Sequence, residues 1–156
     1  MKSSPLTVLL PDSRSKNYMF NFIDTPGHPS FSDEVTVGLR LSDGVLLVVD
    51  CVEGVTVFVE RLVKEAMRAR LPIVCVINKL DRLVLELKLP PADAYFKIKH
   101  TLDELNLIIQ SYAGIHQDRQ PFLSPLSGNV VFASTLFSCC FTIKSFSQRY
   151  FEKNRT

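Results

Sequence analysis

The chain has 156 residues, of which 46% are hydrophobic and 22% charged, and its formal net charge is +2. This composition fits one soluble globular domain. Because acidic and basic residues are interspersed, the charge gives no support for a nucleic-acid-binding or membrane-surface protein. No apolar stretch approaches the length of a membrane span, and the N-terminus lacks the layout of a secretory signal, so the sequence favours an intracellular protein without membrane contact.

Five apolar runs are predicted to be β-strands. The first two, residues 6–10 and 18–23, flank a loop rich in Pro, Asp, Ser and Asn, which predicts a hairpin. The next three, residues 44–49, 72–77 and 129–133, are continuous runs rich in Val and Ile. Such runs are typical of parallel strands that are covered on both faces.

Helical patterns lie between and after these runs. Residues 58–67 carry two adjacent apolar rows, which we interpret as core packing, and a long amphipathic pattern over 95–112 follows a Pro-Pro pair. Residues 113–128 are predicted to form a loop, and residues 141–156 a C-terminal lead-out helix. Strands that alternate with helices predict an α/β fold with a mostly parallel sheet.

The cysteines lie inside apolar runs and show no zinc-ligand spacing. They are Cys51, Cys75, Cys139 and Cys140. We expect reduced, buried thiols that form neither a disulfide nor a metal site.

Polar residues directly follow several of the predicted strands. In chain order these are Asp24 to His28, Asp50, Asn78 to Asp81, and Ser134 with Thr135. Ligands of open α/β sheets bind at the carboxyl ends of the strands, so the sequence predicts a binding site there. We expect Asp50 to cap the turn that leads to Gly54 rather than to contact ligand, and we assign no role to His100 or His116.

The segment Asn78-Lys79-Leu80-Asp81 has the chemistry of a guanine reader. Asp81 can accept hydrogen bonds from the ring N–H and the exocyclic amine of guanine, whereas adenine presents an acceptor at that edge. Asn78 can tie the base to neighbouring loops, and Lys79 can lay its apolar stem along the base. The alternative is a plain surface turn, which the preceding buried strand argues against.

The segment from Asp24 to His28 has the chemistry of a phosphate sensor. Asp24 can hold Mg²⁺ through water, the backbone N–H of Gly27 can approach a terminal phosphate, and His28 can orient an attacking water. The alternative is a simple connection from strand to helix, in which Ser30 or Ser32 caps the helix.

These motifs resemble the GTP-binding domain of the translational GTPase superfamily, in its ribosomal translocase branch. The resemblance covers nearly the whole chain and rests on residues 24–28, 42–55, 78–81 and 128–146. It implies a three-layer, P-loop GTPase-like α/β fold with GTP or GDP and Mg²⁺ as cofactors. Within the branch, residues 11–28 and 83–106 are more similar to the spliceosomal GTPases of the U-five small nuclear ribonucleoprotein than to the elongation factor.

The resemblance also implies roles for residues of the first motif. Asp24 would be the magnesium-associated aspartate, Gly27 would supply the amide for the γ-phosphate, and His28 would be the catalytic residue that orients water. Pro29 departs from the family pattern, which has an aliphatic residue there, and a proline stiffens a segment that must move.

The later motifs receive roles in the same way. Asn78, Lys79 and Asp81 would read guanine. Ser134 would belong to the loop whose backbone amide supports the guanine carbonyl oxygen, and Thr135 stands at a position that varies in the family.

The sequence contains no G-x-x-x-x-G-K-[ST] motif, the loop that holds phosphates and Mg²⁺ in such enzymes. By resemblance, residues 1–156 would be a partial GTP-binding domain, truncated at its N-terminus, that starts after the phosphate loop and the first switch. We expect these residues alone to bind GTP no better than about millimolar and not to hydrolyse it. The missing strand would lie between the strands that end at Ile23 and Val49, so sheet edges open to self-association are expected.

Three functions are compatible with these features. The resemblance favours a regulatory GTPase of the nucleus that acts with spliceosomal proteins and small nuclear RNA in pre-mRNA splicing, where it controls RNA unwinding. A ribosomal translocation elongation factor of the cytoplasm is the second, and a nucleotide-free interaction fragment is the third. Whether the chain by itself is an enzyme is left open.

Overall fold

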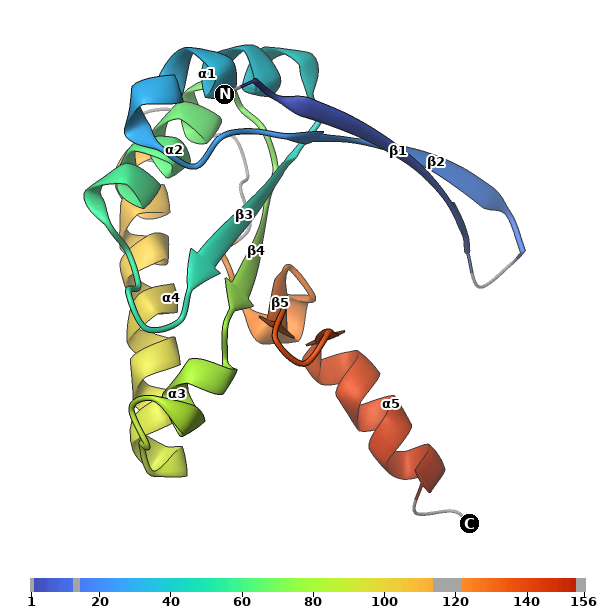
Figure 1. Ribbon diagram of the computed structural model, residues 1–156, viewed down its shortest axis with the longest axis vertical. Helices are drawn as coiled ribbons and strands as arrows, with labels where there is room; N and C mark the ends of the chain where they lie inside the picture. Colours follow the sequence, from blue (N-terminus) through green and yellow to red (C-terminus); the bar gives the residue numbers. More distant parts are fainter. Residues whose placement is uncertain (1, 13–14, 114–121, 154–156) are drawn as a thin grey trace. The chain divides into compact units, whose positions relative to one another are not determined.

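The computed structural model describes residues 2–12, 15–113 and 122–153 (Figure 1). These residues form two compact units, Met1–Asp43 and Gly44–Thr156, and each is described by itself. None of the helices in the described ranges is both long and apolar enough to cross a membrane.

The first unit is a hairpin followed by a short helix. Strands β1 (Ser4–Pro11) and β2 (Asn17–Asp24) pair antiparallel along their whole length. The 3-10 helix η1 (Pro29–Phe31) then leads into α1 (Ser32–Leu41). The predicted hairpin is confirmed.

Two features tie the segments of this unit together. The Glu34 carboxylate in α1 accepts hydrogen bonds from the backbone N–H (3.2 Å) and the hydroxyl (3.0 Å) of Ser3, and these bonds lower the pKa of Glu34. A Cβ added at Gly38 would lie 2.9 Å from Cγ2 of Thr25, so only a glycine allows α1 to approach the end of β2 this closely.

The second unit is built on a four-stranded sheet with the order β3-β4-β5-β6. Its parallel strands are β3 (Val45–Asp50), β4 (Ile73–Asn78) and β5 (Val130–Ser134), and β6 (Cys139–Phe141) pairs antiparallel with β5. The predicted α/β class with a mostly parallel sheet is confirmed. The sequence did not predict β6, because three residues are too few to show a periodic pattern.

The helices of this unit follow the predicted patterns closely. They are α2 (Val57–Arg68), α3 (Asp81–Leu85), α4 (Pro91–Ala113), the 3-10 helix η2 (Pro125–Ser127) and α5 (Ile143–Lys153). The predicted helices are confirmed as α2, α4 and α5, whereas α3 and η2 were not expected. Residues 114–121 of the predicted loop and residues 154–156 of the predicted tail helix lie outside the described ranges.

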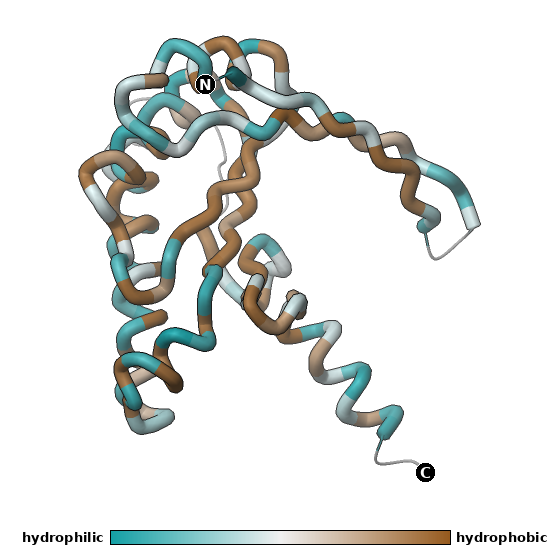
Figure 2. The backbone as a smooth tube through the Cα atoms, in the orientation of Figure 1, coloured by the Kyte–Doolittle hydropathy of each residue, from teal (hydrophilic) through white to brown (hydrophobic). Residues whose placement is uncertain are grey.

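The core lies between the sheet and two helices, α2 and α4, and Figure 2 shows the apolar character of the central strands. Its sheet members include Leu47, Val49, Cys75, Ile77 and Val130, and its helix members include Val63, Ala66, Leu102, Leu105 and Ile109. Each fully buried aliphatic side chain contributes about 1.5–3 kcal/mol to folding. The apolar rows predicted in α2 are therefore core packing, as expected.

The face of β3 that points away from α2 and α4 is exposed. Leu46 and Val48 of β3 are 53% and 54% exposed. The expectation of burial on both faces is therefore wrong for β3. Side chains alternate across a strand, and α2 and α4 cover the face that carries Leu47 and Val49. Among the described strands β3 pairs only with β4, so its outer edge is the open edge that the sequence led us to expect.

The cysteines divide into two pairs. Cys51 and Cys75 are fully buried, and burial raises their pKa values to about 11 and about 12. Cys139 and Cys140 are exposed, because they lie on the short edge strand β6, so the prediction of burial was wrong for these two. All four are free thiols.

Candidate functional site

The loop after β4 carries three of the predicted guanine readers. Lys79 has a φ of 61°, a left-handed conformation that is unfavourable for a residue with a side chain. Local hydrogen bonds compensate: the Lys79 N–H donates to Oδ1 of Asn78 (2.7 Å), and the Cys51 thiol donates to the Lys79 carbonyl (2.9 Å). The Leu80 N–H donates to the carbonyl of Ala133 in β5 (3.2 Å). The ends of β3 and β5 therefore hold this loop in its turn.

Asp81 is the first residue of α3, and its carboxylate is fixed from a neighbouring strand. The buried hydroxyl of Ser134, at the end of β5, donates to Oδ1 of Asp81. No other described residue hydrogen-bonds to this carboxylate, so Oδ2 can accept a bond from a ligand. The structure thus brings Asn78, Lys79, Asp81 and Ser134 together at the carboxyl ends of β4 and β5, although the contact of Ser134 is made by its side chain.

Asp50, the last residue of β3, joins this group through its carboxylate oxygen Oδ2. Oδ1 accepts from the backbone N–H of Val52 (2.8 Å), which is the predicted turn cap. Oδ2 lies 3.0 Å from Nζ of Lys79 and 2.7 Å from Nη1 of Arg82. Burial alone would raise the pKa of Asp50, but the hydrogen bonds from Val52, Lys79 and Arg82 outweigh it and hold that pKa below its usual range. The sequence did not predict the ion pairs, since spacing along the chain does not show which cations face an aspartate.

The turn from Asp24 to His28 lies in the first unit. Asp24 ends β2 with its side chain exposed, and Pro26 is buried. A Cβ added at Gly27 would meet no atom within 4 Å, and the φ of this residue is not positive. The fold therefore gives no reason for a glycine here, whereas a backbone N–H that is approached closely by a ligand does.

His28 has a local role that the sequence did not reveal. Its Nδ1 accepts a hydrogen bond from the Ser30 N–H (3.2 Å) at the start of η1, and its ring makes an edge contact with Phe31. The alternative interpretation, in which Ser30 or Ser32 caps the helix, does not hold, because His28 itself caps η1 and α1 has no side-chain cap. A neutral imidazole whose Nδ1 accepts carries its hydrogen on Nε2, so the exposed His28 presents a donor to a ligand.

A magnesium ion would depend on few protein groups. In the described ranges no three His, Cys, Asp or Glu side chains gather to hold a metal. A single exposed carboxylate such as Asp24 suits Mg²⁺, which keeps several of its waters and takes its remaining ligands from phosphates.

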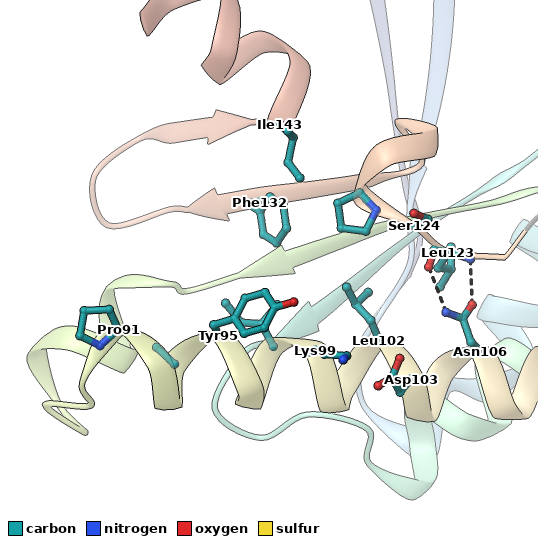
Figure 3. A pocket seen from close by; sticks show the side chains of 13 residues that line it. Pro91, Tyr95, Lys99, Leu102, Asp103, Asn106, Leu123, Ser124, Phe132 and Ile143 are labelled. Carbon is teal, nitrogen blue, oxygen red and sulfur yellow. Dashed lines mark hydrogen bonds between the residues drawn. The ribbon is translucent and has the colours of Figure 1, made fainter.

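A groove of about 560 Å³ lies elsewhere in the second unit, between α4, η2, β5 and the start of α5 (Figure 3). Tyr95, Leu102 and Phe132 form part of its mostly apolar lining. The side chain of Asn106 exchanges two hydrogen bonds with the backbone of Leu123 along its wall (2.8 and 2.9 Å). None of the predicted nucleotide-binding residues lines this groove.

Comparison with known proteins identifies relatives along almost the entire chain. The model of the elongation factor Tu GTP binding domain matches residues 2–147. The 110 kDa U5 small nuclear ribonucleoprotein component CLO of Arabidopsis thaliana is 49% identical over 150 residues, which are 96% of this chain and 15% of that protein. The pre-mRNA-splicing factor cwf10 of Schizosaccharomyces pombe is 46% identical over 154 residues, which are 99% of this chain and 15% of that protein.

A third relative gives the same result. The pre-mRNA-splicing factor SNU114 of Saccharomyces cerevisiae is 44% identical over 151 residues, which are 97% of this chain and 14% of that protein. The chain thus spans about 15% of the length of the curated relatives it matches.

Proposed function

Because the chain belongs to the family of the elongation factor Tu GTP binding domain, we propose that it is the guanine-nucleotide-binding part of a GTPase that acts in pre-mRNA splicing. Its ligand would be GTP or GDP with Mg²⁺, its place the nucleus, and its partners spliceosomal proteins and small nuclear RNA. The names of the relatives support splicing rather than ribosomal translocation.

One observation supports the proposal: Ser134 holds one oxygen of the Asp81 carboxylate and leaves the other able to accept a hydrogen bond from a ligand. Ser134 occupies Oδ1, and Oδ2 has no partner among the described residues. A carboxylate accepts up to about four hydrogen bonds, so Asp81 has capacity for both the ring N–H and the amine of guanine. Adenine would leave this carboxylate unpaired, which costs binding energy.

The residues of the first unit would serve the phosphate end of the nucleotide. The exposed carboxylate of Asp24 would hold Mg²⁺ through water, and the N–H of Gly27 would donate to the terminal phosphate. When bound, Mg²⁺ neutralises charge on the phosphate oxygens. His28 would donate from Nε2 to the oxygen of the attacking water and so orient it, rather than remove its proton through Nδ1, which is already engaged.

The test is a change of base preference in the intact protein. Asp81→Asn replaces one acceptor by a donor, so it should weaken GDP binding by about a hundredfold and favour xanthosine diphosphate, whose carbonyl at that edge accepts from an amide. Both dissociation constants are measured by calorimetric titration. Glu65→Gln, which removes a carboxylate from an exposed ion pair on α2, is the matched control and should change neither constant.

Two outcomes would contradict the proposal. If the wild-type protein binds no guanine nucleotide, the third function, a nucleotide-free interaction fragment, is favoured instead. If Asp81→Asn binds GDP as tightly as the wild type does, Asp81 does not read the base.

A further inference from the structure

The carboxylate of Asp50 contacts both ends of the loop that carries Asp81. Its Oδ2 pairs with Lys79, two residues before Asp81, at 3.0 Å, and with Arg82, the next residue, at 2.7 Å. Its Oδ1 accepts from the N–H groups of Val52 (2.8 Å) and Glu53 (3.4 Å), which fix the carboxylate on the turn after β3. Asp50 therefore connects a rigid turn to a loop from the neighbouring strand.

The environment of these groups favours an ordered ion pair. The side chain of Asp50 is only 12% exposed and that of Arg82 is 26% exposed, whereas that of Lys79 is 49% exposed. The charged tip of Lys79 thus meets a shielded carboxylate, while the Lys79 side chain as a whole stays about half exposed. The paired carboxylate also raises the pKa of Lys79, in keeping with the attraction.

The backbone adds a second constraint at the same place. Asp50 and Asn78 are opposite each other in the parallel ladder of β3 and β4. The N–H of Cys51 donates to the carbonyl of Asn78 (3.0 Å), and its thiol donates to that of Lys79 (2.9 Å). With the backbone of Lys79 held in this way, the remaining freedom lies in its long side chain, and Asp50 restrains that side chain.

We propose that Asp50 is a positioning residue for guanine binding, which acts by holding the ammonium group of Lys79 so that the stem forms a fixed surface for the base. This inference rests on the proposed function. A free lysine side chain loses considerable rotamer entropy when a ligand orders it. A lysine that is already held loses less, so the base binds more tightly than it would to a mobile side chain. Arg82 assists by pairing with the same carboxylate oxygen, Oδ2.

The test is Asp50→Asn in the intact protein, with the dissociation constant of GDP as the readout. The amide oxygen of Asn can still accept from Val52, so the turn is preserved while the charge that holds Lys79 is removed. We expect GDP to bind about tenfold more weakly, since a charge-assisted contact is lost without loss of a contact to the base. Glu65→Gln, which breaks the exposed Arg61–Glu65 pair on α2, is the control and should leave the constant unchanged.

A double-mutant cycle separates positioning from a general effect on structure. If Asp50 acts through Lys79, then Asp50→Asn should have no further effect on GDP binding once Lys79→Ala is present. The proposal is overturned if Asp50→Asn leaves GDP affinity unchanged, or if it weakens binding equally in both backgrounds. Lys79→Met provides a second route should Asp50→Asn fail to fold, because Met keeps an apolar stem but cannot pair with Asp50. It should lose about as much affinity as Asp50→Asn, and wild-type affinity in Lys79→Met would also overturn the proposal.

Failure of this inference can be told apart from failure of the proposed function. Loss of GDP binding by Asp81→Asn together with wild-type affinity in Asp50→Asn would refute the role of Asp50 alone. Absence of GDP binding by the wild-type protein would refute both.

Discussion

The loop at residues 78–82 and the turn at residues 24–28 are held in different ways. The loop is bonded to the ends of β3 and β5, and both Lys79 and Asp81 have side-chain partners. The turn exposes Asp24, Gly27 and His28, and the side-chain contacts within it are local ones made by His28. On the proposed function, the base-binding loop would be preorganised by the fold, whereas the turn at the phosphate end would gain its order from the ligand.

The largest expected effect tests whether the turn at residues 24–28 acts in GTP hydrolysis rather than in the affinity for nucleotide. His28→Ala in the intact protein removes the donor that would orient water, so turnover of GTP should fall about a hundredfold while GDP affinity stays nearly constant. Single-turnover hydrolysis and GDP titration measure the two quantities. His100→Ala, on the exposed side of α4, is the control and should alter neither. An unchanged turnover in His28→Ala would remove its catalytic role and leave it as a cap of η1.

A smaller effect distinguishes two glycines of the first unit. In Gly38→Ala the new methyl would meet Cγ2 of Thr25 at 2.9 Å, so the free energy that protects the β2 amides should fall by about 1 kcal/mol. In Gly27→Ala the new methyl enters open space, so protection should change by less than about 0.5 kcal/mol. Native-state hydrogen exchange measures both.

For nucleotide binding, the substitution at Gly27 is the one expected to matter. Gly27→Ala should weaken GTP more than GDP, because its methyl would crowd a terminal phosphate at the backbone N–H. If Gly27→Ala instead lowers protection as much as Gly38→Ala does, the glycine is there for the backbone of the turn, and the proposed contact with phosphate loses its support.

Most of the fold was predictable because its signals are local. The Val- and Ile-rich runs, the helix rows around Val63 and the Pro-Pro start of α4 are patterns within single segments. The loop from Asn78 to Asp81 was likewise recognisable, since the residues that define the motif are consecutive in the chain. Where these residues lie was confirmed, while their contacts with nucleotide stay predictions.

The features that the sequence missed depend on tertiary contacts. The exposed face of β3 around Leu46 follows from which side α2 and α4 cover, and the exposure of Cys139 follows from the edge position of β6. The pairing of Asp50 with Lys79 and Arg82 joins residues about thirty positions apart in the chain, which no periodicity links. One signal in the sequence would have suggested this pairing. An aspartate ends one predicted strand, and a cation directly follows the neighbouring parallel strand.

The smallest expected effect concerns pH and the loop. The folded-state pKa of Asp50 lies below its usual value of about 3.9, so its ion pairs stabilise the protein fully at neutral pH. That stabilisation is lost as the pH falls below about 4 toward the lower folded-state pKa, because the carboxyl group then takes up a proton. Hydrogen exchange of the β3 and β4 amides measures their free energy of protection. The difference in this free energy between wild type and Asp50→Asn should therefore become smaller from pH 7 to pH 3. A difference that stays constant across this range would mean that the charge of Asp50 stabilises neither Lys79 nor Arg82, because Asp50→Asn keeps the acceptor for Val52.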